Sequence, residues 1–327
     1  MTEPSFEIFL TVVPGLEAEA AQEARDLGFA GAKRIPGGVV FQGGWQDVMR
    51  ANLWLRGPTR VLLRIAGFRA MHLAQLDKRA RKIHWSDILR RDLPVRVEAA
   101  SRKSRIYHQG AVTERFQGAL AAAGIPLSPE AGMTVKVRIE DDFCTVSLDT
   151  SGAPLHLRGH KQAVVKAPLR ETMASLLLRR MGYRPGETVV DPMCGSGTFI
   201  LEAAARAAGL APGRSRSFAF EELAAFDPEA WASLKAAKVA EPREANLVGY
   251  DRDAGAIKAS RENASRAGVA HLCQYAVQAV GALAPPPGPP GLVIANPPNG
   301  ARIGDRKQHF ALDGTQGGGL RAPGVAG

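Results

Sequence analysis

The chain has 327 residues, of which 45% are hydrophobic and 23% are charged, and it has a formal net charge of +10 at pH 7. These proportions are typical of a globular protein of two or three domains, and no run approaches the roughly 18 apolar residues of a membrane-spanning helix. Thr2–Leu10 lacks the pattern of a secretion signal, and the three widely spaced cysteines show no metal-binding pattern, so we expect a cytoplasmic protein without a metal site or a membrane association.

Residues 1–68 alternate between strand and helix patterns and are expected to form a small ferredoxin-like α/β part. Alternation and turn residues predict the elements in this order: strand Phe6–Val13, helix Leu16–Leu27 ending at Gly28, strand Val39–Phe41, helix Trp45–Leu55 and strand Val61–Phe68.

Residues 69–158 are expected to form a second α/β module. The predicted elements are helix Ile83–Leu89, strand Val95–Ala99, helix Ala111–Ala123, and strands Thr134–Glu140 and Phe143–Asp149 with a hairpin turn between them. Most of the positive charge precedes residue 171, because residues 1–170 contain 25 Lys and Arg against 17 Asp and Glu, whereas residues 171–327 contain 17 against 15.

The densest basic stretch, Asp77–Arg105, has ten basic and four acidic residues and would attract a polyanion. The candidate RNA-binding residues in it are Arg79, Arg81, Lys82, Arg102, Lys103 and Arg105. Few aromatic residues accompany these charges, which favours contacts with the backbone and shape of RNA over base stacking. A solvated helix face in an arginine-rich protein is the alternative.

Residues 159–327 are expected to form a third domain that begins with a connector, residues 159–168, and helix Leu169–Met181. In the connector, Lys161 and Lys166 can either contact RNA or be solvated. A short β-branched strand, Glu187–Val190, and a helix, Thr198–Ala208, flank the glycine loop of this domain. The loop reads Asp191-Pro192-Met193-Cys194-Gly195-Ser196-Gly197-Thr198.

The two glycines of this loop let the backbone approach a ligand, and the hydroxyls of Ser196 and Thr198 stand beside the first free N–H groups of the helix. We therefore predict a nucleoside-cofactor loop, because the pattern fits neither the dinucleotide nor the triphosphate motif. An ordinary β–α turn is the alternative. Cys194 as a nucleophile is disfavoured, because no histidine lies near it in sequence.

Strand Leu247–Asp251 is expected to place the Asp251 carboxylate, with Arg252 beside it, in the same crevice for the ribose of the cofactor. Asp251 as an ordinary acidic residue at a helix start is the alternative. The distance from the glycine loop to Asp251 is longer than usual, so residues 209–245 are expected to form an inserted helical segment with its own apolar face. Helix Ala254–Ala267, stopped by Gly268, follows the strand.

Strand Leu292–Ala295 ends at Asn296, which is followed by Pro297, Pro298 and Asn299. The prolines stop the strand and hold Asn296 in a rigid turn. The Asn296 amide oxygen and the Pro297 carbonyl can then grip the two hydrogens of an aromatic amine and orient its lone pair towards an electrophilic methyl group. A tight turn without chemistry is the alternative.

Three segments together make the chain resemble the class I RNA methyltransferases with a THUMP domain, and most closely the bacterial 23S rRNA guanine-N2-methyltransferases: residues 156–197, 248–269 and 292–305. The resemblance implies S-adenosyl-L-methionine as the cofactor, a Rossmann-like catalytic domain, a THUMP part at residues 69–158, and structured RNA, ribosomal RNA above all, as the partner. It also implies that Asp191, Cys194, Gly195, Gly197 and Asp251 contact the cofactor, and that Asn296, Pro297 and Pro298 clamp the amine. The predicted site further includes Met193, Ser196, Thr198 and Arg252 on the cofactor side and Asn299 among the catalytic residues.

The sequence departs from the family pattern in several places. Asn299 replaces an aromatic residue that stacks on the target base, and Gln278 is the polar candidate where an acid usually reads the adenine amine. Only 28 residues follow Asn299, and they are rich in glycine, so we expect the last strands of the fold to be missing and an apolar sheet edge to invite homo-oligomers. A catalytically inactive or impaired RNA-binding relative is therefore the main alternative, and a DNA adenine methyltransferase is a third.

Overall fold

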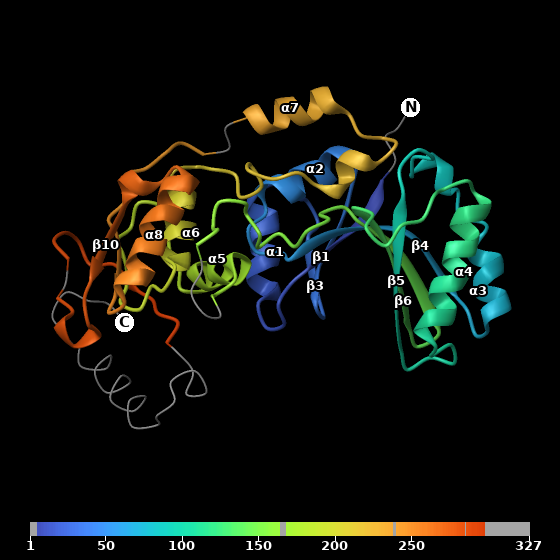
Figure 1. The fold of residues 1–327 in the computed structure, drawn as a ribbon, viewed down its shortest axis with the longest axis horizontal. Helices are drawn as coiled ribbons and strands as arrows, with labels where there is room; N and C mark the ends of the chain where they lie inside the picture. The colour runs from blue at the N-terminus through green and yellow to red at the C-terminus, as the bar shows by residue number, and fades with distance from the viewer. Residues whose placement is uncertain (1–4, 164–167, 238–239, 285, 298–327) are drawn as a thin grey trace. The chain divides into compact units, whose positions relative to one another are not determined.

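A computed structural model describes residues 5–163, 168–237, 240–284 and 286–297, and these divide into two compact units. The first unit comprises the chain up to Leu155 together with Arg216–Ala237, and the second comprises His156–Ser215 and the chain from residue 240. Figure 1 traces both units along the chain. Within the described residues, no helix has the length and apolar character needed to cross a bilayer.

The first unit is built on a seven-stranded sheet of order β2-β3-β1-β4-β7-β6-β5. Its strands are β1 (Phe6–Thr11), β2 (Lys33–Ile35), β3 (Gly38–Gly43), β4 (Arg60–Arg69), β5 (Val95–Arg102), β6 (Met133–Glu140) and β7 (Phe143–Asp149). All neighbours are antiparallel except β5 and β6, and a bulge in β4 between Arg64 and Ala66 shifts its register against β7. Strand β4 therefore joins the two predicted amino-terminal parts into one continuous sheet.

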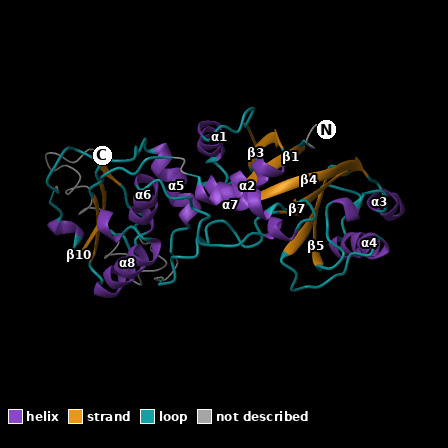
Figure 2. Cartoon of the chain, turned by 90° about the horizontal axis from the view of Figure 1, so that it is seen from above, coloured by secondary structure: helices purple, strands orange, loops and turns teal. Residues whose placement is uncertain are grey.

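The helices of this unit are α1 (Glu17–Asp26), α2 (Trp45–Trp54), α3 (Leu73–Ala80), α4 (Gln109–Ala122) and α7 (Pro228–Ala236). Helices α3 and α4 lie side by side at the β5–β6 end of the sheet (Figures 1 and 2). The prediction of a helix at Ile83–Leu89 was wrong. Only a single 3₁₀ turn, Trp85–Asp87, forms there, because Trp85 turns inward and donates its ring N–H to the Ala80 carbonyl at the end of α3.

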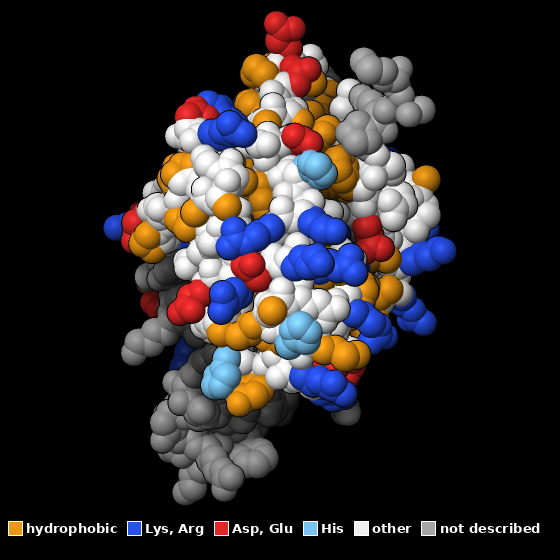
Figure 3. Space-filling view, turned by 90° about the vertical axis from the view of Figure 1, so that its right-hand side faces the viewer, with side chains coloured by type: hydrophobic (Ala, Val, Ile, Leu, Met, Phe, Trp, Pro, Cys, Tyr) orange, Lys and Arg blue, Asp and Glu red, His pale blue; other side chains and the backbone are white. Residues whose placement is uncertain are grey.

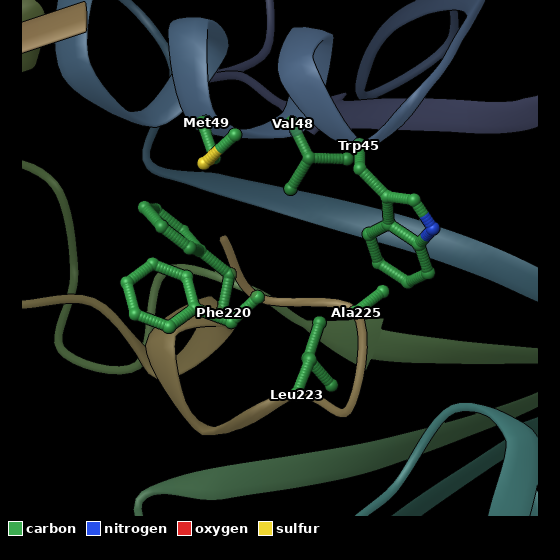
Figure 4. A pocket seen from close by; sticks show the side chains of 7 residues that line it. Trp45, Val48, Met49, Phe220, Leu223 and Ala225 are labelled. Carbon is green, nitrogen blue, oxygen red and sulfur yellow. The ribbon is translucent and has the colours of Figure 1, made fainter. Parts of the chain in front are cut away.

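The inserted segment predicted at residues 209–245 adds an apolar layer to the first unit. It contains a short 3₁₀ helix, Ala219–Glu222, followed by α7. Phe220, Leu223 and Ala225 face Trp45, Val48 and Met49 of α2 across a small pocket with apolar walls (Figure 4). Because its lining is aliphatic and aromatic, we interpret the pocket as a gap in the apolar packing of the inserted segment on α2.

The second unit contains a parallel sheet of order β10-β9-β8-β11 in the described residues. Its strands are β8 (Val189–Asp191), β9 (Leu247–Asp251), β10 (Cys273–Val277) and β11 (Leu292–Val293), and its helices are α5 (Glu171–Arg180), α6 (Thr198–Ala207) and α8 (Ala254–Ala267). Helices α6 and α8 pack on the sheet, and α5 packs on α6. The core between them consists of aliphatic and aromatic side chains such as Val189, Phe199 and Ile257.

Candidate functional site

The strand order of the second unit reverses beside β8. The chain runs from β8 outward to β9 and β10, and then crosses back to pair β11 with the other side of β8. In a parallel sheet, such a reversal of strand order opens a binding crevice outside the carboxyl ends of the strands. The point of reversal here lies between β8 and β11.

Four predicted site residues stand at this same edge. Asp191 ends β8, Asp251 ends β9, Gln278 directly follows β10, and Asn296 lies three residues after the end of β11. Strand pairing fixes their levels, because Val190 is level with Val293 and Asp191 is level with Gly249. The fold thus brings together residues that are up to 105 positions apart in the sequence.

The glycine loop is bonded directly to the end of β9. The Cys194 amide donates to the Tyr250 carbonyl at 2.8 Å, and the Gly195 amide donates to Asp251 Oδ2 at 2.9 Å. The other Asp251 oxygen accepts the Asp253 amide at 2.9 Å. These bonds hold the Asp251 carboxylate at the edge of the sheet in a fixed orientation.

Glycine is required at two positions of this arrangement for lack of space. A Cβ on Gly197 would lie 2.9 Å from the Tyr275 hydroxyl, and Gly197 has a φ of +85°, which side chains rarely adopt. A Cβ on Gly249 would lie 2.7 Å from the Tyr275 ring. Tyr275 of β10 therefore packs beneath the loop, and it is a supporting residue that sequence reasoning missed.

The loop has the features that a nucleoside cofactor with an amino-acid tail requires. The Ser196 hydroxyl is buried and has no hydrogen-bond partner among the described residues. The first N–H groups of α6 have no intrahelical acceptor, as at any helix start, and suit a carboxylate. Asp251 supplies acceptors for ribose hydroxyls, so the residues present fit the predicted cofactor.

The two aspartates at the edge differ in environment. Burial raises the pKa of Asp191 to about 8, and the neighbouring charge of Asp251 adds to this rise. Its side chain keeps one backbone bond, from the Met193 amide at 3.1 Å. Burial also raises the pKa of the Cys194 thiol, and a thiol that resists ionisation is a poor nucleophile, in agreement with the expectation from sequence.

Asn296 and Pro297 are exposed at the end of β11. The strand leading to them is anchored on β8, because the Ile294 amide donates to the Val190 carbonyl at 2.9 Å. Pro298 and Asn299, the remaining predicted catalytic residues, lie outside the described residues. Arg252, beside Asp251, is exposed. The backbone N–H of Gln278 donates to the backbone carbonyl of Asp251 at 2.9 Å.

The structure does not support the predicted RNA-binding role of Lys161. Its Nζ lies 3.2 Å from Glu171 Oε1 and donates to Thr198 Oγ1 at 2.9 Å, and its side chain is only 4% exposed. A buried amine held by these partners is not available to a polyanion. Lys161 instead ties the connector to the first residue of α6, while Lys166 lies outside the described residues.

Asn263 of α8 forms a second tie between the connector and the glycine loop. Its amide nitrogen donates to the Ala163 carbonyl at 2.7 Å and to the Ser196 carbonyl at 3.2 Å. Sequence reasoning missed this residue. The available signal was an asparagine three residues after Ser260 on the buried face of a helix, where an amide needs bonding partners.

The six basic candidates of the first unit are exposed. Figure 3, which views the right-hand side of Figure 1, shows Lys and Arg side chains gathered across this face. Arg81 is bonded to Asp77 at 2.8 Å within α3, and Arg105 lies 3.9 Å from Asp142. The Arg105 side chain is nevertheless 70% exposed and remains accessible to a ligand.

Comparison with known protein families gives two matches. Residues 158–315 match the family described as RMKL-like, methyltransferase domain, and residues 7–62 match the RlmL ferredoxin-like domain. The predicted fold class, a Rossmann-like methyltransferase domain preceded by a ferredoxin-like part, is confirmed by these matches and by the structural neighbours below.

Two curated proteins illustrate the sequence similarity. A putative RNA methyltransferase of Synechocystis sp. is 32% identical over 312 residues, which cover 91% of this chain and 81% of that protein. The ribosomal RNA large subunit methyltransferase K/L of Psychromonas ingrahamii is 31% identical over 320 residues, which cover 93% of this chain and 43% of that protein. The chain thus spans less than half the length of this second relative.

Two solved structures share the fold. A predicted N6-adenine-specific DNA methylase from Listeria monocytogenes has a TM-score of 0.90 and 31% identity, covering 98% of this chain and 87% of its own. A putative methyltransferase, SMU.472, complexed with SAH has a TM-score of 0.84 and 26% identity, with the same two coverages.

Proposed function

The chain belongs to the RMKL-like methyltransferase family, and from this premise we propose that it transfers a methyl group from S-adenosyl-L-methionine to the exocyclic N2 amine of a guanine in 23S ribosomal RNA. One observation carries the proposal. The glycine loop, Asp251 and Asn296 stand at the same carboxyl edge of a parallel sheet, on both sides of its switch in strand order.

The donor side consists of the loop and the end of β9. The cofactor supplies an electrophilic methyl group on a positively charged sulfur. Ser196 and the start of α6 would hold its amino-acid part, Asp251 its ribose, and Gln278 its adenine. Because the Gly195 amide donates to the Asp251 carboxylate, the glycine loop and the end of β9 are held together before the cofactor binds. The order imposed before binding lowers the entropy lost on binding.

The acceptor side consists of Asn296 and Pro297. Two acceptors in a rigid turn would take the hydrogens of the guanine amine and direct the nitrogen lone pair towards the methyl group. This orientation replaces a strong base, and its contribution resembles that of a preorganised polar group in other active sites. The exposed position of Asn296 leaves room for a nucleotide that has turned out of its stack.

The first unit would bind the RNA. Its exposed arginines and lysines suit a phosphate backbone, and the name of the Psychromonas relative points to ribosomal RNA as the substrate. We propose the predicted division of the chain into a ferredoxin-like part, 1–68, a THUMP part, 69–158, and a catalytic domain, 159–327, whose segment Arg216–Ala237 belongs to the first unit. Because β4 belongs to the sheet of both parts, we expect them to fold together.

A substitution at Asn296 tests the acceptor side. Asn296→Ala removes one acceptor of the amine, so methyl transfer should fall by about 100-fold or more, by analogy with loss of one preorganised polar group. The measurement is transfer of labelled methyl to RNA from cells that lack the protein. Gln274→Ala, an exposed amide in the middle of β10, is the matched control and should retain full activity.

Calorimetric titration with S-adenosylmethionine separates the two sides, because Asn296→Ala should bind the cofactor as the unaltered protein does. Wild-type transfer rates in Asn296→Ala would contradict the proposed clamp.

The acceptor class is tested by offering RNA and DNA to the same preparation, since one structural neighbour has the name of a DNA methylase. Methylation of DNA alone would overturn the proposal of an RNA substrate. RNA binding without any methyl transfer would favour the alternative that the chain is an inactive RNA-binding relative. Asn299, which replaces the aromatic residue of the family, is the reason for that alternative. In that case, gain of activity in Asn299→Tyr would trace the defect to the missing aromatic ring.

A further inference from the structure

An exposed aromatic pair stands beside the basic loop that joins β5 to α4. The Tyr107 side chain is 69% exposed, and its ring lies against that of His108, with 4.2 Å between ring centroids and 38° between planes. Tyr and His are intermediate in their average burial in globular proteins, so a Tyr ring with this exposure is well above that average. Arg102, Lys103 and Arg105 precede the pair within five residues and are exposed.

The loop that presents Tyr107 is firmly held by its neighbours. Ile106 is buried, and the Ser101 hydroxyl donates to its carbonyl. The Arg105 amide donates to Asp142 Oδ1 at 2.8 Å, and the Asp142 amide donates to the Ser104 hydroxyl at 3.1 Å. Rigid support of the residues that precede an exposed ring suits a binding site, because less entropy is lost when a ligand is bound.

Charge and shape around the ring favour one kind of ligand. The Arg105 guanidinium, two residues before Tyr107 in the sequence, lies 3.7 Å from the sulfur of Met71, which is itself 45% exposed. The acidic neighbours are Glu140, which is level with Arg102 in the β5–β6 pair, and Asp142, whose oxygens are already engaged by Arg105. A flat apolar ring beside cations matches a base stacked on an aromatic platform with its phosphate near by.

We propose that Tyr107 and His108 form a stacking site for an unpaired RNA nucleotide, with Arg102, Lys103 and Arg105 contacting its phosphates. This rests on the proposed function, since it specifies how the first unit recognises RNA. It differs from the expectation from sequence, which favoured contacts with the backbone and shape of RNA over base stacking. The site would select unpaired segments that adjoin a duplex.

Binding of short RNA probes tests this site. The probes are a fluorescein-labelled single-stranded oligoadenylate and an RNA duplex of equal length, titrated at low salt with the full chain. Tyr107→Ala should weaken oligoadenylate binding by about 5-fold to 150-fold, which corresponds to the 1–3 kcal/mol of one base stack, and should leave duplex binding unchanged. Tyr107→Trp should retain the affinity and report stacking by quenching of the new indole.

Two further variants serve as controls. Arg105→Ala should weaken binding of both probes, because a phosphate contact does not distinguish them. Leu127→Ala removes a 38% exposed apolar side chain from the same unit and should change neither.

Equal oligoadenylate affinity in Tyr107→Ala and the unaltered chain would overturn the site, as would an equal loss for both probes. Failure of the unaltered chain to bind oligoadenylate would overturn it too. Methyl transfer measured on the same preparations keeps the two proposals apart. If no methyl is transferred but Tyr107→Ala still weakens oligoadenylate binding, only the proposed methyltransferase activity is contradicted. If methyl is transferred but Tyr107→Ala does not weaken that binding, only the stacking site is contradicted.

Discussion

At the scale of single residues, two carboxylates at the same sheet edge have different environments. Asp251 is partly exposed and accepts two backbone N–H groups, from Gly195 and Asp253. Asp191 is almost fully buried and accepts one, from Met193. Desolvation disfavours the charged form and raises the pKa of Asp191, which therefore retains its proton to about pH 8.

The raised pKa of Asp191 predicts a pH-dependent stability. Its folded pKa, about 8, exceeds its ordinary value of 3.8, so the folded chain binds the extra proton between these values. The contribution of Asp191 is therefore full at low pH and is lost as the pH rises towards 8. Asp191→Asn keeps the acceptor for the Met193 amide but cannot ionise.

Urea unfolding of the cofactor-free protein measures this effect. The stability of Asp191→Asn relative to the unaltered chain should increase from about pH 5 to about pH 8, by roughly a few kcal/mol in the unfolding free energy. A difference that stays constant over this interval would show that Asp191 is ionised throughout. Asp253→Asn, at an exposed helix cap, is the control and should show no such trend.

At the scale of elements, the inserted segment is the main departure from a simple Rossmann-like unit. It lies between α6 and β9 of the second unit in the sequence, yet its residues Arg216–Ala237 belong to the first unit. Arg216 donates to the carbonyls of Ser151, Ala153 and Pro154, and the Phe220 amide donates to the Thr150 carbonyl. The segment is thus part of the folded core of the first unit.

Trp231 of α7 is the centre of this packing. Its ring meets Phe220 edge-on at 5.0 Å and Phe218 at 5.8 Å, and the residue is 3% exposed. Trp231→Ala should lower the unfolding free energy of the first unit by about 3–5 kcal/mol, the usual cost of removing a buried Trp. Thermal and urea unfolding followed by circular dichroism measure the loss.

Lys235→Ala is the control for this element, because Lys235 is exposed and lies over the Trp231 ring at 5.2 Å. It should cost no more than about 1 kcal/mol. Unchanged stability in Trp231→Ala would show that the segment contributes little to the first unit.

At the scale of the whole molecule, the candidate RNA-binding residues and the candidate catalytic residues lie in different units. The predicted RNA-binding residues other than Lys161 and Lys166 lie in the first unit, whereas the glycine loop, Asp251 and Asn296 lie in the second. Variants of the first unit should therefore change RNA affinity without changing cofactor affinity.

The double variant Arg79→Ala, Lys82→Ala tests this division. Both side chains are exposed at the end of α3, and removing a cation that touches a phosphate should reduce the slope of log affinity against log salt by about 1. Filter binding to ribosomal RNA fragments at several salt concentrations gives the slope, and calorimetry gives the cofactor affinity. Arg184→Ala with Lys258→Ala, an equal charge loss from exposed positions of the second unit, is the control. An equal slope in both double variants would contradict the division.

Local pattern was sufficient for much of the fold. The period of two in β1 and β4 and the glycine loop between β8 and α6 were read correctly, because strand alternation and turn chemistry are properties of neighbouring residues. Strand β2 and helix α3 were missed. Strand β2 has three residues, and α3 has an N-cap, His72, that is not a usual capping residue.

By itself, the sequence determined the family, the cofactor and the two motifs of the candidate site. Each of these depends on residues adjacent in the chain, and the family match and the SAH-bound neighbour confirm the first two. Only the tertiary structure decided which side chains are available. Lys161, a predicted RNA contact, is buried and bonded to Thr198, whereas Tyr107 is exposed beside the basic loop. The free energy of a charge or a ring depends on the water excluded around it, and that is set by chain segments far away in the sequence.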